Sequence, residues 1–196
     1  MIISVIARVL SIVGHPAVVV PGTIFWLSSR RAAQIEQAMA AGLAAVTVAV
    51  VVVVWCLVQV RAGRWSHVDA SKPDERRLLN RVLLGLLGLA ALGLSTVAQS
   101  ATLVAGAALS AAVVATAVAS ERWIKLSLHT AFAAFAVALV WPEAGATTTL
   151  AVLTVAIAWS RLSLGRHALV DVVSGAFAGA IAGVALRTLP TLPALS

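Results

Sequence analysis

The chain has 196 residues, of which 61% are hydrophobic and only 11% are charged. A soluble domain of this length needs far more polar surface, so the composition argues against a soluble enzyme and indicates a membrane protein. The formal net charge of +7 does not indicate a nucleic-acid partner, because the basic residues are scattered between apolar runs. Anionic lipid headgroups or a phosphorylated substrate explain these charges better.

Seven apolar segments follow one another along the chain. They cover residues 2–27, 38–60, 78–98, 101–120, 126–141, 146–160 and 168–188. We expect each to be helical, since open strands cannot span lipid without unpaired backbone groups. The sequence therefore predicts an all-α fold, a polytopic transmembrane helix bundle of six to seven spans that forms one integral-membrane domain over residues 1–196. We expect no cleavable signal peptide and no soluble domain.

Three local features refine this prediction. The first segment contains His15-Pro16 and Pro21-Gly22, so we expect it to be kinked or broken. Cys56, the one cysteine, lies in a valine-rich run and is expected to be inert, either in the core or facing lipid. Gln99-Ser100 predicts a tight hairpin between the third and fourth segments.

The fifth and sixth segments are short, at about 15 residues each, or roughly 23 Å as helices. Such a pair cannot cross the full hydrocarbon core unless one end is recessed inside the bundle. The recessed end carries Ser127, His129, Arg161 and His167. Since irregular backbone at membrane depth is tolerated where it lines a wet cavity, we expect a site there.

The stretch SRLSLGRHALVD, residues 160–171, concentrates polar residues between two apolar runs. His167 and Asp171 are four residues apart and share one helix face, where the carboxylate can hold one imidazole nitrogen and leave the other nucleophilic. The planar guanidinium of Arg161 can donate two parallel hydrogen bonds to phosphate oxygens. A structural ion pair at a helix end is the alternative, but a His–Asp pair within the membrane favours a functional site.

A second polar cluster, KLSLHTA, opens the fifth segment. Lys125, Ser127 and His129 lie where helix N–H groups favour anions, and His129 could protonate a leaving alkoxide. The alternative is a helix N-cap at Ser127 followed by a hydrogen-bonded histidine.

A third cluster, HVDASKPDERRLLN at residues 67–80, places Lys72, Arg76 and Arg77 before the third segment. The alternative here is a solvated linker with cytoplasmic positive charges. Counting the spans puts all three clusters on one side of the membrane, which favours a common site.

The three clusters resemble the motifs of the type 2 phosphatidic acid phosphatase family. Ser160-Arg161-x5-His167-x3-Asp171 matches the third motif, S-R-x5-H-x3-D, at every fixed position. Leu126-Ser127-Leu128-His129 keeps the serine and histidine of the second motif, P-S-G-H. Asp69-x6-Arg76-Arg77 keeps only the arginine of the first, Lys-x6-Arg-Pro, and has aspartate in place of the lysine. The motif regions are 69–77, 125–130 and 160–171.

This resemblance implies a histidine phosphoenzyme mechanism without a metal or another cofactor. His167 would attack phosphorus, Asp171 would orient it, and His129 would protonate the leaving lipid alkoxide. The resemblance implies these phosphate-binding residues: Arg161, Arg76, Ser127 and Ser160, with Lys72 or Lys125 in the place of the missing lysine.

We therefore expect a membrane phosphatase that hydrolyses a lipid phosphate monoester or diphosphate, of the phosphatidate, phosphatidylglycerol phosphate or prenyl (di)phosphate type. Its partners would be this substrate and membrane lipids. Homo-oligomer formation is open, since Gly175, Gly179 and Gly183 allow close packing within the bundle or between chains. Vanadate-dependent haloperoxidases use similar motifs but are soluble. A non-enzymatic lipid-binding or transport protein with a degenerate phosphatase site is the other alternative.

The basic residues also predict location. Arginine outnumbers lysine twelve to two, and alanine and valine abound, which indicates a bacterial inner-membrane protein with multiple passes. Eleven lysines and arginines fall on the side that carries the motifs and three on the other. The positive-inside rule then predicts a cytoplasmic site.

Overall fold

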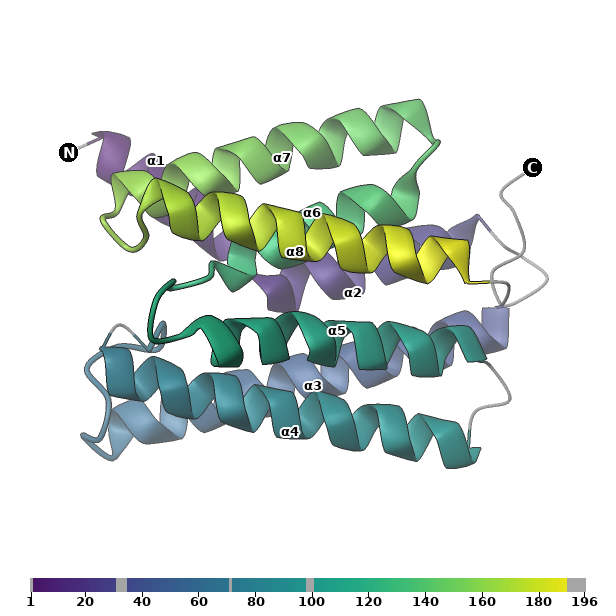
Figure 1. The fold of residues 1–196 in the computed structure, drawn as a ribbon, viewed down its shortest axis with the longest axis horizontal. Helices are drawn as coiled ribbons and strands as arrows, with labels where there is room; N and C mark the ends of the chain where they lie inside the picture. The colour runs from purple at the N-terminus through teal and green to yellow at the C-terminus, as the bar shows by residue number, and fades with distance from the viewer. Residues whose placement is uncertain (1, 31–34, 71, 98–100, 190–196) are drawn as a thin grey trace.

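The structure, a computed structural model, describes residues 2–30, 35–70, 72–97 and 101–189, which form eight helices and no strand (Figure 1). The helices are α1 (Ile2–Val13), α2 (Pro16–Ser29), α3 (Ile35–Arg61), α4 (Pro73–Val97), α5 (Ala101–Ser120), α6 (Leu128–Val140), α7 (Ala144–Ser163) and α8 (Leu169–Thr188). Among them, α3, α4, α5, α7 and α8 are long and apolar enough to span a membrane, and the bent pair α1 and α2 passes as a sixth span. The predicted helical membrane bundle is confirmed.

The first span is broken at the predicted histidine–proline pair. Helix α1 ends at Val13, α2 begins at Pro16, and the two are bent by 52°. At the break the His15 Nδ1 accepts a hydrogen bond from the Ala17 N–H at 3.1 Å. It thereby satisfies a backbone donor that has no partner within α2. The pair Pro21-Gly22, by contrast, lies inside α2 without breaking it.

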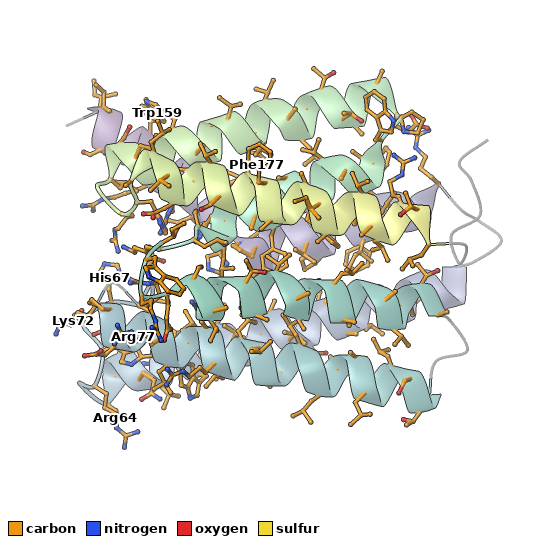
Figure 2. The ribbon with its side chains drawn as sticks, in the orientation of Figure 1. Arg64, His67, Lys72, Arg77, Trp159 and Phe177 are labelled. Carbon is orange, nitrogen blue, oxygen red and sulfur yellow. The ribbon has the colours of Figure 1, made fainter. Side chains whose placement is uncertain are left out.

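Helix α6 lies at the centre of the bundle, between α2, α7 and α8. All residues from Thr130 to Ala136 are buried, as expected for a helix that is apolar on every side. The glycines of α8 permit this close approach: a Cβ at Gly179 would overlap the Ala131 carbonyl oxygen, and one at Gly183 would lie 2.6 Å from the Ala138 Cβ. These glycines therefore pack within the chain, while Phe177 on the same helix faces outward and is 66% exposed (Figure 2).

Two predicted boundaries are wrong. Helix α7 has 20 residues instead of about 15, since it also includes residues 144–145 and 161–163. Arg161 is buried and donates to the Ser11 hydroxyl at 2.7 Å, so a charged residue that ends the apolar run in the sequence lies inside the helix. Of the two helices expected to be short, only α6 is, with 13 residues. Helix α4 begins at Pro73, so Arg76 and Arg77 lie on it instead of preceding it. A proline in the first turn followed by acidic residues favours that early start.

The loop between α3 and α4 is anchored to the bundle by Trp65 and Ala70, although most of its described residues are exposed. Trp65 is 6% exposed and packs against Cys56 and Ala70. Its ring meets the Trp55 ring edge-on at 4.9 Å. Cys56 is therefore a core residue, the first of its two predicted environments. The predicted hairpin at Gln99-Ser100 lies outside the described residues.

Candidate functional site

Three loops meet at one end of the bundle, the left end in Figure 1. They are the loops α3–α4 (62–72), α5–α6 (121–127) and α7–α8 (164–168). Contacts join them: the Lys125 N–H donates to the Asp171 carboxylate, and Arg161 forms an ion pair with Asp69. The structure thus brings residues from all three predicted polar clusters to one place.

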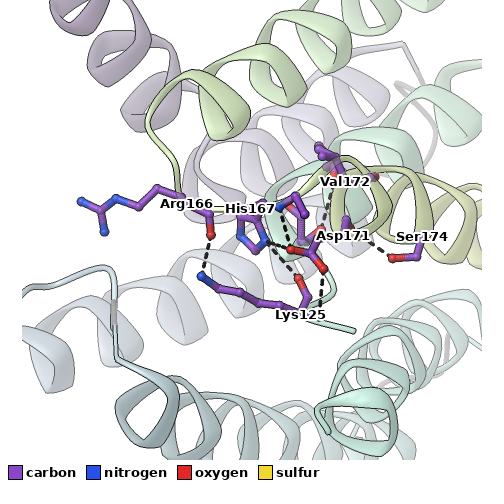
Figure 3. A network of polar contacts seen from close by, with 9 residues as sticks. Lys125, Arg166, His167, Asp171, Val172 and Ser174 are labelled. Atoms are coloured by element: carbon purple, nitrogen blue, oxygen red, sulfur yellow. Dashed lines mark hydrogen bonds and ion pairs between the residues drawn. The ribbon is translucent and has the colours of Figure 1, made fainter. Parts of the chain in front are cut away.

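His167 lies in the α7–α8 loop and not on the last helix as predicted, since α8 begins only at Leu169. It follows a tight turn out of α7, in which Gly165 adopts a φ of +62° that favours glycine. Its Nδ1 lies 2.9 Å from the Lys125 carbonyl oxygen (Figure 3). Because a carbonyl can only accept, this contact requires the proton on Nδ1 and leaves a lone pair on Nε2. The imidazole is therefore held as a potential nucleophile by a backbone group that the sequence pattern did not reveal.

Asp171 ties two of the loops together, as the dashed lines in Figure 3 show. Its Oδ1 accepts from the Lys125 N–H at 3.0 Å, and its Oδ2 accepts from the Ala168 N–H at 2.8 Å. The Oδ2 also lies 3.5 Å from the His167 Nδ1. Asp171 therefore orients the imidazole mainly by fixing the backbone at Lys125 and at Ala168, and only secondarily by direct attraction to the ring.

The surroundings of His167 keep it neutral. Burial lowers the pKa of His167 to about 4, with further lowering by the charges of Arg161 and Lys125 and a smaller opposing effect of Asp171. Burial, followed by the charge of Arg76, also lowers the pKa of Lys125, whose Nζ donates to the Arg166 carbonyl at 2.5 Å. At neutral pH the imidazole thus carries no proton on Nε2, as a nucleophile requires.

Arg161 is the buried cation of the site, with 5% of its surface exposed. Its Nη1 donates to the Ser11 hydroxyl at 2.7 Å and lies 3.7 Å from the Asp69 Oδ2. Arg166 approaches the same oxygen, also at 3.7 Å. The Arg161 Nε is buried and has no hydrogen-bond partner among the described residues. This orphaned donor is available to an anion.

His129 lies in the first turn of α6, where its ring meets that of His15 edge-on at 5.0 Å. The His129 Nε2 is buried without a hydrogen-bond partner in the described part of the chain, and so is the hydroxyl of Ser127, which caps α6 by position alone. Buried polar atoms of this kind are rare unless water or a ligand satisfies them. His15 is a site residue that was predicted only as part of the kink, although a histidine inside an apolar span is itself a functional signal.

The remaining predicted phosphate-binding residues divide into two groups. Arg76 interacts electrostatically with Asp171 and lines the cavity described below. Lys72 is exposed and points away from the bundle (Figure 2), and the buried Ser160 hydroxyl donates to a carbonyl of its own helix at 2.7 Å. Of the two candidate lysines, Lys125 is therefore the one near the other site residues. Arg77 pairs with Asp74 at 3.6 Å, on the surface.

A cavity of about 700 Å³ runs from this cluster between the helices. Its polar end is lined by His15, Asp69, Arg76, His129, Arg161 and His167. Apolar side chains of α2 to α6 line most of the remainder, among them Ile24, Val48, Leu87 and Phe132. A largely apolar cavity with a few polar groups at one end suits an amphiphilic ligand that has a hydrocarbon chain and an anionic headgroup.

Neither a metal-binding group among the described residues nor a matching known protein was found. Within the described ranges, no three His, Cys, Asp or Glu side chains are grouped so that they could hold a metal ion. A scan against protein-family models, a search of curated proteins and a search of solved structures each gave no match.

Proposed function

We propose that this membrane protein is a phosphatase that hydrolyses a lipid phosphate monoester or diphosphate through a phosphohistidine intermediate. The observation that carries the proposal is the arrangement at the cavity's polar end. A neutral His167 with its Nδ1 tied to a carbonyl lines the same cavity as Arg76, Arg161 and His129. The resemblance of the three motifs to the type 2 phosphatidic acid phosphatases supports the same assignment.

In this mechanism the His167 Nε2 forms a bond to phosphorus as the bond to the lipid oxygen breaks. His129, whose Nε2 is otherwise unpartnered, gives a proton to the departing alkoxide. Water then attacks the phosphohistidine while His129 takes up a proton from this water, so that the P–N bond breaks, inorganic phosphate is released and both histidines are restored. Phosphoryl transfer needs little beyond a positioned nucleophile, an acid and a cationic cradle, which Arg161 and Arg76 provide here.

The cavity favours a lipid substrate over a soluble phosphate ester. With the phosphate at the polar end, the hydrocarbon chain would lie against the apolar side chains that line the rest. Phosphatidate, phosphatidylglycerol phosphate and prenyl (di)phosphates all have this form. Assays of phosphate release across such a panel identify the substrate.

The direct test is phosphate release by the purified protein in detergent. We expect His167→Ala to abolish turnover, because the nucleophile is lost. His67→Ala is the matched control, since His67 is an exposed histidine on the α3–α4 loop. Near wild-type turnover by His167→Ala would show that the nucleophile assignment is wrong.

One observation favours a second candidate function, that of a lipid-binding or transport protein without catalysis. Asp69 stands where the phosphatase family has lysine, and it already pairs with Arg161. If the site only binds, the wild-type protein should retain lipid phosphates without releasing inorganic phosphate from any of them. Release from one substrate by the wild type, but not by His167→Ala, excludes this candidate.

We also propose that the protein lies in the inner membrane of a bacterium with the site on the cytoplasmic side, on the basis of the positive-charge excess. Two matched thiols test the orientation in a Cys56→Ala background. Ala62→Cys lies at the end with the site and Ala144→Cys at the opposite end, and both alanines are exposed. A membrane-impermeant thiol reagent applied to intact cells should label position 144 only; labelling of position 62 only would reverse the orientation.

A further inference from the structure

Asp69 places a negative charge inside the cationic end of the cavity. Its Oδ2 lies 3.7 Å from the Nη1 of Arg161 and 3.7 Å from the Nη1 of Arg166. The carboxylate lines the cavity and is 30% exposed, whereas the Arg161 side chain is only 6% exposed. One carboxylate oxygen thus faces Arg161, the buried cation that lines the cavity, and also Arg166 in the α7–α8 loop.

The fold holds the backbone next to Asp69 in position. The next residue, Ala70, has a φ of 47°, which a non-glycine residue adopts only at an energetic cost. Ala70 is 2% exposed and packs in one cluster with Trp65 and Cys56. Its N–H also donates to the His67 carbonyl at 3.1 Å. The backbone beside Asp69 is therefore anchored, and the ion pair does not rest on a freely moving loop.

We propose that Asp69 is the internal counter-anion of this site: its carboxylate holds Arg161 and Arg166 while the site is empty, and a phosphate group must displace it from them in order to bind. The inference rests on the proposed phosphate site and adds to it how that site selects among anions. Asp69 would determine which anions bind and how tightly.

Electrostatics explains both why Asp69 pairs with Arg161 in the empty site and why it opposes phosphate binding. A buried guanidinium without a counter-charge is strongly destabilising, so an empty site with Arg161 needs an anion near it. When phosphate arrives, the carboxylate becomes a like charge a few ångströms away and opposes binding. An anion that carries more charge than one carboxylate, such as a phosphate dianion or a diphosphate, is then favoured over a singly charged one.

The experiment measures binding of inorganic phosphate to the full-length protein in detergent by titration calorimetry. Asp69→Asn removes the charge at nearly constant size, so we expect its dissociation constant for phosphate to fall by about tenfold or more relative to the wild type. Asp74→Asn is the matched control, because Asp74 is 95% exposed and pairs only with the surface residue Arg77 among the described contacts. This control should bind phosphate as the wild type does.

A second measurement covers the stability of the variant. Without Asp69 the buried Arg161 lacks its counter-charge, so Asp69→Asn should melt at a lower temperature in the absence of phosphate and gain more from added phosphate than the wild type. If Asp69→Asn cannot be purified, Asp69→Glu keeps the charge on a longer side chain and should bind phosphate no more tightly than the wild type.

The outcomes separate this inference from the proposed function. Unchanged or weaker phosphate binding by Asp69→Asn, with the wild type active, overturns the role of Asp69 and leaves the phosphatase proposal intact. Tighter binding by Asp69→Glu has the same consequence. If neither the wild type nor Asp69→Asn binds phosphate and no lipid phosphate is hydrolysed, the proposed function fails, and this inference fails with it.

Discussion

Asp171→Asn is the substitution whose effect follows most directly from the geometry. The carboxylate accepts one backbone N–H on each oxygen, from Lys125 at 3.0 Å and from Ala168 at 2.8 Å. An asparagine retains one acceptor and turns an NH2 group towards the other donor. Since a hydrogen bond to a charged group contributes about 1.5–3 kcal/mol, the variant loses about 2 kcal/mol or more of the energy that holds the two loops.

That loss should appear in both stability and turnover. If about 2 kcal/mol of positioning is lost in the transition state, kcat falls roughly 30-fold, which is less than the complete loss expected for His167→Ala. The assay compares kcat and thermal unfolding in detergent for Asp171→Asn and the exposed control Asp74→Asn. An Asp171→Asn protein with wild-type kcat and unfolding temperature would refute the role assigned to these two backbone bonds.

Three further predictions concern the cradle, the metal and the pH profile. Arg76→Lys should lose at least tenfold in kcat/KM because the bidentate fork is lost, whereas Arg77→Lys, a surface residue, should be mild; equal effects would mean that the wrong arginine lines the site. Activity should survive EDTA, and complete loss restored by one added divalent ion would contradict a histidine-only mechanism. Because the pKa of His167 is about 4, the nucleophile stays unprotonated above that pH and is lost as the pH falls through it. Lys125→Met removes a charge that lowers this pKa, so the acid limb of kcat/KM should move to higher pH relative to the wild type; a shift to lower pH would contradict the electrostatic account.

Hydropathy was sufficient to predict most of the fold. Long apolar runs have few alternatives to helices in lipid, and the His15-Pro16 pair marked the break because proline removes a backbone donor. The ends of helices were less predictable. Arg161 ends the apolar run in the sequence, but in the structure it is buried and bonded to Ser11, and α7 continues to Ser163.

The local part of the candidate site was visible in the sequence, and its long-range part was not. The spacing predicted His167 and Asp171 on one helix face, but His167 lies in the α7–α8 loop, before α8 begins at Leu169. Its Nδ1 still lies 3.5 Å from the Asp171 Oδ2, whereas its bond to the Lys125 carbonyl depends on how two loops pack. The contact between Arg161 and Ser11 joins residues 150 positions apart. No periodicity encodes such pairs, because the first follows from the packing of two loops and the second from the packing of α1 against α7.

The contacts of Asp69 are likewise long-range and could not be predicted from the sequence. In the sequence it is only a departure from a family motif, in the position of a lysine. In the structure it is an ion-pair partner of Arg161 and a lining residue of the cavity. Asp69 therefore places a negative charge beside Arg161 at the polar end of the cavity, which the sequence pattern alone does not show.

The central claim is that His167 carries the phosphoryl group during turnover. The most direct measurement is mass spectrometry of the wild-type protein, quenched in alkali during turnover of the lipid phosphate that it hydrolyses. We expect a phosphohistidine on the peptide that contains His167, and no such adduct in His167→Ala. Steady release of phosphate with no adduct on His167, or with the adduct on another residue such as His129, would contradict it.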